Sequence, residues 1–142
     1  MLSPALKVKD FGVGLWPFDG DLATLLKDHS CIVVETYPAE ACVHLDIPPP
    51  GRGWSKRNQK DRANHYETLS KWSEKRNIKL SSSLSAELRD GFGPLEDGED
   101  PLDATLGIFS MLEVVLGHRP DGAPHDPVTR KIEGWIFGQA SK

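Results

Sequence analysis

Hydrophobic residues recur along the chain in two spacings, one typical of strands and one typical of helices. The run 31–35 is short, apolar and rich in β-branched residues up to its last position, which predicts a strand buried on both faces. Glu35 ends this run, so a carboxylate stands at the carboxyl end of the predicted strand. In α/β proteins, ligands and catalytic groups gather at such strand ends. The pattern therefore makes Glu35 the first candidate functional residue.

Most other apolar residues recur at helical spacing. The pattern predicts a helix capped by Asp19 that ends near residue 28, helices over 39–45, 61–77, 81–89 and 100–116, and short strands over 78–80 and 132–137. Residues 118–131, with three prolines, are expected to form a loop. Apolar residues surround the whole axis of the helix 100–116, which predicts that it is largely buried. Strands that alternate with helices favour an α/β fold, with helices packed on a short mixed sheet.

Composition limits the classes of protein to which the chain can belong. With 142 residues, 38% of them hydrophobic and 27% charged, residues 1–142 are expected to form one globular domain. We expect a soluble, cytoplasmic protein without a membrane segment, because no apolar run is long enough to cross a bilayer. Cys31 and Cys42 lack any metal-binding spacing, so we expect reduced thiols in or near the core.

The net charge of −4 is unevenly distributed. Residues 52–79 hold nine basic and three acidic residues, whereas the segments on either side are acidic. Basic side chains beside an indole can bind a phosphate backbone while the indole stacks on a base. The candidate nucleic-acid-binding residues are Arg52, Trp54, Lys56, Arg57, Lys60 and Arg62. A solvated loop and helix start explain the same residues equally well.

Asp100 and Asp103 stand three positions apart at the start of a predicted helix, on one face of its first turn. Capping explains this placement, since Asp100 suits an N-cap and Pro101 suits the first helical position. Likewise, Glu35 could be simply the first solvated residue after its strand. If the strand end and the helix start meet, however, Glu35, Asp100 and Asp103 form a set of hard oxygen donors suited to Mg²⁺ or Mn²⁺.

Three short stretches together resemble a family of predicted ribonuclease H-like nucleases. They are VVETYPAE at 33–40, DPLDA at 100–104 and EGWI at 133–136, and the turn WPFDG at 16–20 is also similar to the family's. The resemblance spans residues 11–137. It implies that Glu35 matches the acid of the family's fourth strand and that Asp103, with Asp100, matches the acids of its last helix. It also implies an accessory carboxylate at Glu133.

The resemblance implies a metal-dependent nuclease that hydrolyses phosphodiester bonds, in a partial ribonuclease H-like fold that begins at the fourth strand. The family's first acid, on an N-terminal strand followed by a hairpin, has no counterpart in residues 1–10. We therefore expect a homodimer or a completing polypeptide. The alternative is a non-catalytic nucleic-acid-binding or assembly module, and a phosphotransferase is a third possibility.

Overall fold

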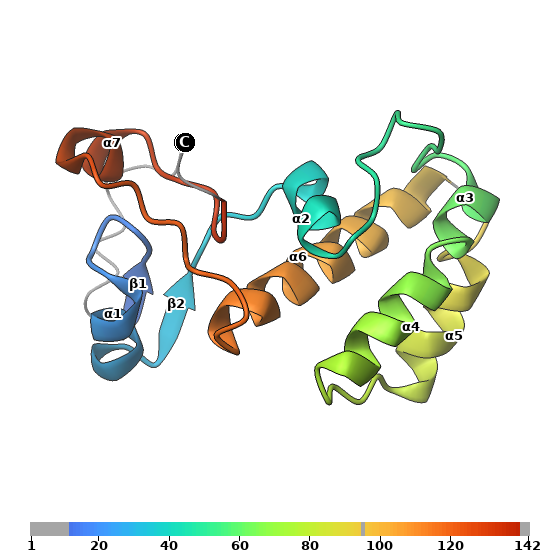
Figure 1. The fold of residues 1–142 in the computed structure, drawn as a ribbon, viewed down its shortest axis with the longest axis horizontal. Helices are drawn as coiled ribbons and strands as arrows, with labels where there is room; N and C mark the ends of the chain where they lie inside the picture. Colours follow the sequence, from blue (N-terminus) through green and yellow to red (C-terminus); the bar gives the residue numbers. More distant parts are fainter. Residues whose placement is uncertain (1–11, 95, 140–142) are drawn as a thin grey trace.

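The computed structural model describes residues 12–94 and 96–139. The expectation about residues 1–10 and the first residue of the resemblance lie outside these ranges. The chain forms an α/β structure whose described sheet has two parallel strands, β1 and β2 (Figure 1). In chain order, the elements are β1 (Val13–Leu15), α1 (Leu22–Asp28), β2 (Cys31–Val33), α2 (Pro38–His44), α3 (Gln59–Ala63), α4 (Tyr66–Lys75), α5 (Ser82–Asp90), η2 (Glu96–Gly98), α6 (Glu99–Val115) and α7 (Pro127–Ile132).

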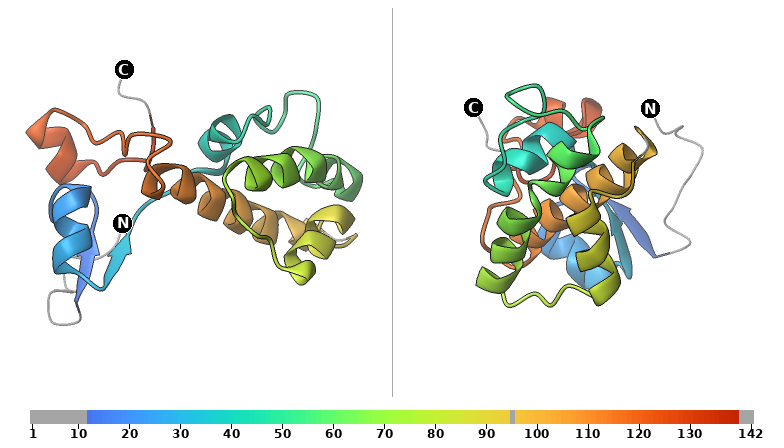
Figure 2. Two further views of the ribbon diagram at one scale, coloured as in Figure 1. Left: turned by 60° about the horizontal axis from the view of Figure 1, so that its bottom comes forward. Right: turned by 90° about the vertical axis from the view of Figure 1, so that its right-hand side faces the viewer.

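Helix α6 is the axis around which the other elements are arranged (Figures 1 and 2). Its N-terminal part packs with α2, α4 and α5 around a cluster of buried apolar residues that includes Leu69, Leu102 and Leu106. Its C-terminal end packs with the strands and α1 around a second cluster, which includes Trp16 and Val114. The helix therefore joins a helical region to a strand region.

Capping residues explain several helix ends. Asp21, and not Asp19, caps α1, because its carboxylate accepts the Thr24 amide at 3.0 Å while Asp19 accepts the Leu15 amide. Ser81 caps α5, as the sequence predicts, and Gly91 ends it in the left-handed region at φ 70°. A side chain at Gly91 would meet the backbone carbonyl of Gln59, so this position requires glycine.

The predictions over 61–77, 78–80 and 118–137 need correction. The expected helix 61–77 is divided into α3 and α4, and the chain turns at His65, whose ring packs on Trp54. Residues 78–80 form no strand.

Helix α7 lies in a segment expected to be a loop. It forms because Asp126 caps it and Pro127 suits its first position. The expected strand 132–137 makes only one parallel bridge, between Ile136 and Glu35.

The face of β2 also departs from the prediction of full burial. Its register pairs Val13 with Cys31 and Leu15 with Val33, so these four residues share one face of the sheet. Cys31 is exposed and 43% of Val33 is exposed, whereas Ile32 points to the cluster that contains Val114. Cys31 is therefore not a core residue. A short apolar run does not distinguish a strand that is covered on both faces from one that is covered on a single face.

Helix α6 begins at Glu99 after Gly98, so Asp100 is not its N-cap. It ends at Val115, one residue before the predicted end. The helix is not buried on all sides, since Ile108 is 51% exposed and Val115 is 56% exposed. Neither Ile108 nor Val115 belongs to the two apolar clusters, which pack against the other side of α6. Apolar residues around the whole helix axis therefore predicted more burial than the structure has.

Candidate functional site

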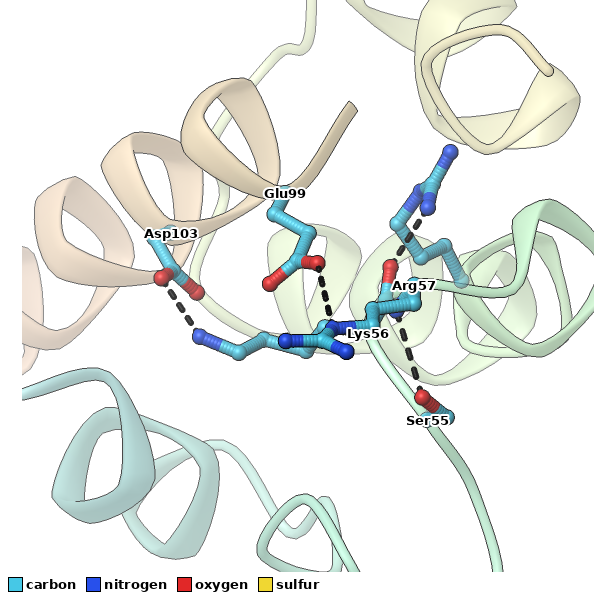
Figure 3. Close-up of polar contacts among 6 residues, drawn as sticks. Ser55, Lys56, Arg57, Glu99 and Asp103 are labelled. Atoms are coloured by element: carbon cyan, nitrogen blue, oxygen red, sulfur yellow. Dashed lines mark hydrogen bonds and ion pairs between the residues drawn. The ribbon is translucent and has the colours of Figure 1, made fainter. Parts of the chain in front are cut away.

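Two ion pairs connect the basic segment to the first turns of α6 (Figure 3). Lys56 Nζ lies 2.6 Å from Asp103 Oδ2, and Arg57 Nε lies 3.7 Å from Glu99 Oε1. Glu99 and Asp103 stand one helical turn apart and project toward the same loop (Figure 3). The structure therefore brings members of the predicted basic set together with one of the predicted acids.

The two pairs differ in burial and hence in strength. The side chains of Lys56 and Asp103 are 22% and 23% exposed, and their short contact is a charge-assisted hydrogen bond. The Arg57 side chain is 77% exposed, so water screens its longer contact with Glu99. Burial, followed by the charge of Asp103, raises the pKa of the Cys42 thiol to about 11. Cys42 is thus a buried, reduced core thiol, as expected from the sequence.

Arg62 fixes the backbone beside Lys56. Its side chain is almost completely buried, with Nε donating to Gly91 O and Nη2 to Gly93 O, both at 2.7 Å. Nη1 donates to the carbonyl of Lys56 itself. The guanidinium predicted to contact phosphate therefore holds together loops of its own chain. Arg62 stands in a polar stretch of the sequence, which did not predict that its side chain would be buried.

The remaining basic candidates are more open to solvent. Arg52 and Lys60 are exposed. Trp54 is half-buried, because its Nε1 donates to Pro48 O at 2.7 Å and its ring lies edge-on to His65, with centroids 4.3 Å apart.

Glu35 stands apart from the acids of α6. It is exposed and lies two residues after β2, where its carbonyl accepts the Phe137 amide at 2.9 Å. A Cβ built on Gly134 would lie 4.0 Å from Glu35 Oε2, whereas one built on Gly107 of α6 would lie 2.9 Å from Thr36 Oγ1. Neighbouring side chains of extended backbone point in opposite directions, so Thr36 faces α6 and Glu35 faces Gly134.

The other predicted acids lie at helix ends. Asp100 is exposed in the first turn of α6, and Glu133 is exposed at the end of α7, next to Gly134. Within residues 12–94 and 96–139, no three His, Cys, Asp or Glu residues are grouped so that they could hold a metal ion. One feature does fit a cation. Asp103 Oδ1 is buried without a hydrogen-bond partner, and a carboxylate oxygen is a ligand that Mg²⁺ prefers.

Two further buried polar groups that the sequence did not reveal lie along the C-terminal half of α6. Glu113 accepts from Trp72 Nε1 and Arg76 Nε at 2.6 Å and from Arg76 Nη2 at 2.9 Å. Burial opposes its ionisation, but the hydrogen bonds from Arg76 and Trp72 outweigh burial and lower the pKa of Glu113. This network fastens α4 to α6. Nothing in the sequence around Glu113 distinguishes it from a solvated residue.

His44 is another buried polar group. Its Nδ1 lies 2.6 Å from Ser110 Oγ of α6, and its Nε2 lies 3.3 Å from Glu40 Oε1 without hydrogen-bond geometry. Burial, followed by the charge of Arg119, lowers the pKa of His44 although Glu40 opposes this shift. Glu40 and His44 stand one helical turn apart, a spacing that by itself is typical of a surface contact. Instead, the ring connects α2 to α6, because α2 buries this face against that helix.

The chain matches no known family model, and no curated protein or solved structure is significantly similar to it. Among the described residues, no helix combines the length and the apolar character needed to span a membrane.

Proposed function

We propose that this chain supplies acidic residues to a ribonuclease H-like nuclease that hydrolyses phosphodiester bonds of nucleic acid with Mg²⁺ or Mn²⁺. The Asp103 carboxylate carries the proposal. One of its oxygens is buried without a hydrogen-bond partner, and the other binds a cationic group, the ammonium of Lys56. Asp103 also lies in the stretch 100–104, one of the three that carry the resemblance.

Helix α6 holds Asp103 on a rigid support. Leu102 and Leu106 are each 1% exposed and fix this part of the helix in the core. A metal ligand on a packed helix keeps its position better than one on a loop. Asp100 lies in the same turn, and its exposed side chain is available to bind an ion beside Asp103.

We assign the ion to Asp103 and Asp100, with Glu35 as the third acid. When bound between carboxylates, such an ion activates a water molecule and stabilises the leaving oxygen of a phosphodiester. Because Glu35 stands apart from Asp103, the proposal assigns completion of the ligand set to Glu35 of a second copy of the chain. The exposed Arg52 and Lys60 supply positive charge for the phosphate backbone.

The test is a cleavage assay with single-stranded, duplex and hybrid nucleic acids in Mg²⁺ or Mn²⁺. We expect metal-dependent cleavage by the unmodified protein and a loss of at least about 100-fold in Glu35→Gln, because a ligand charge is removed. Glu67→Gln is the matched control, since Glu67 is an exposed acid on α4. Equal cleavage by Glu35→Gln, or none by either protein, refutes the nuclease proposal.

A non-catalytic nucleic-acid-binding or assembly module is the second candidate. The Lys56–Asp103 pair favours it, because an ammonium that neutralises the carboxylate serves a stable fold without any metal. The exposed face that carries Cys31 and Val33 favours an assembly role. Nucleic-acid binding without cleavage, lost on Arg52→Ala with Lys60→Ala, supports the binding role. If a second copy of the chain binds the exposed face instead, light scattering will detect a dimer, which supports the assembly role.

A further inference from the structure

The side chains of His44 and Arg119 meet the C-terminal segment 136–139 at Gly138. A Cβ built on Gly138 would lie 3.1 Å from His44 Cε1 and 3.2 Å from Arg119 Cδ, so both side chains pack directly on this backbone. Arg119 Nη1 also donates to the Gly138 carbonyl at 3.1 Å. We propose that His44 is a pH-sensitive latch: its neutral ring holds segment 136–139 against α2 and α6, and its protonation releases the segment. The latch needs neither a metal ion nor nuclease activity.

The buried contacts of His44 fit a neutral ring. Its side chain is 1% exposed, Nδ1 lies 2.6 Å from Ser110 Oγ, and Nε2 is buried without a hydrogen-bond partner. With the proton on Nδ1, the neutral ring donates to Ser110 and Nε2 has no hydrogen to satisfy. A protonated ring carries a second N–H, which costs free energy when it is buried without an acceptor. Glu40 Oε1 is 3.3 Å from Nε2 but outside hydrogen-bond geometry, so the protonated ring has to turn to reach it.

Charged side chains around the ring determine how it responds to protonation. Glu40 on α2 and Glu113 on α6 attract an imidazolium, whereas Arg119, in the segment after α6, repels it. Segment 136–139 carries no ionisable side chain. Burial and the charge of Arg119 outweigh the two acids and hold the pKa of His44 below its ordinary value of 6.5. A form in which the ring is open to water therefore binds the proton more readily than the latched form.

Protonation acts on both contacts that hold Gly138. The ring turns toward Glu40, because the new N–H at Nε2 needs this carboxylate as its acceptor, and so it leaves the Gly138 backbone. The imidazolium also repels the Arg119 guanidinium, which is the donor to the Gly138 carbonyl. The released segment includes Phe137, whose amide donates to the Glu35 carbonyl at 2.9 Å. The latch therefore connects the pH to the backbone that holds Glu35.

The test is hydrogen exchange of the Phe137 and Gly138 amides in the folded protein between pH 7 and pH 5. Rates are compared with those of an unprotected chain at each pH, so that only protection by structure is measured. We expect protection to fall from pH 6.5 down to the folded-state pKa of His44, by up to about tenfold per pH unit, because release takes up one proton. The amide of Leu88 in α5 should keep its protection. Constant protection at Phe137 and Gly138, or a parallel loss at Leu88, overturns the latch.

Two variants assign the pH dependence to its groups. His44→Gln removes the ionisable ring and should abolish the pH dependence of protection, whereas His118→Gln, at an exposed histidine after α6, should retain it. Arg119→Met leaves His44 in place, so it tests the latch even if His44→Gln fails to fold. It should lower the protection of segment 136–139 at pH 7, raise the pKa of His44 in a nuclear magnetic resonance titration and weaken the pH dependence, because the repelling charge is gone. A pH dependence that persists in His44→Gln, or that Arg119→Met leaves unchanged, contradicts the latch.

Discussion

The two ends of α6 are built by different means. Around its N-terminal part, buried apolar residues are reinforced by polar side chains that reach across elements, such as Arg62 to Gly91 and Lys56 to Asp103. Around its C-terminal end, apolar packing supports short parallel strands, with one sheet face exposed at Cys31 and Val33. Asp103 belongs to the first region and Glu35 to the second. The proposed acids are therefore divided between a reinforced region and an open one.

The largest effect on stability should come from Arg62. Arg62→Met removes a buried guanidinium and leaves the carbonyls of Lys56, Gly91 and Gly93 without their donor. We expect the free energy of unfolding to fall by about 3–5 kcal/mol, measured by urea denaturation. Lys60→Met, an exposed site in the same helix, should change it by less than about 0.5 kcal/mol. Similar values for both variants contradict the view that Arg62 reinforces this region.

A smaller effect is expected in the strand region at Gly134. This residue has φ 72°, and a Cβ there would lie 3.1 Å from Phe18 Cζ. Gly134→Ala should lower the free energy of unfolding by about 1–2 kcal/mol from backbone strain, with a further loss from contact with Phe18. Gly53→Ala shares the positive φ but meets nothing within 4 Å, so the difference between the variants isolates the contact. Equal losses in thermal unfolding contradict the contact.

The smallest effect is a pH dependence that comes from His44. Its pKa in the folded chain is below the ordinary value of 6.5, so the unfolded chain binds the proton more readily. The contribution of His44 to stability is therefore complete above pH 6.5 and is lost as the pH falls from there through the folded-state pKa. We expect the free energy of unfolding to fall between pH 7 and pH 5, and to fall less steeply in His44→Gln. Identical slopes contradict the assignment to His44.

Features that depend on local sequence could be predicted. The helix that Pro38 begins, the serine cap and Gly91 end of α5, and the acid-rich first turn of α6 follow from propensity and capping. The α/β class is also confirmed. Strand β1 was not predicted, because three residues with glycine at the centre give no detectable period.

Contacts between distant residues could not be predicted. The Lys56–Asp103 pair joins positions 47 residues apart, and the buried role of Arg62 depends on Gly91 and Gly93, which a later loop supplies. Glu99 was missed, although its spacing from Asp103 places both on one side of a helix. The direction in which Glu35 points depends on how the extended segment lies against α6, which local pattern does not determine.

The most direct test of the proposed acid set is a double-mutant cycle on metal-dependent cleavage with Glu35→Gln, Asp103→Asn and both together. If the two acids serve one ion-binding site, each substitution should lower kcat/KM by about 100-fold and the pair should lower it little further, because the site is already lost. Cleavage that persists in Asp103→Asn, or losses that multiply to about 10,000-fold, would contradict a single site shared by the two regions.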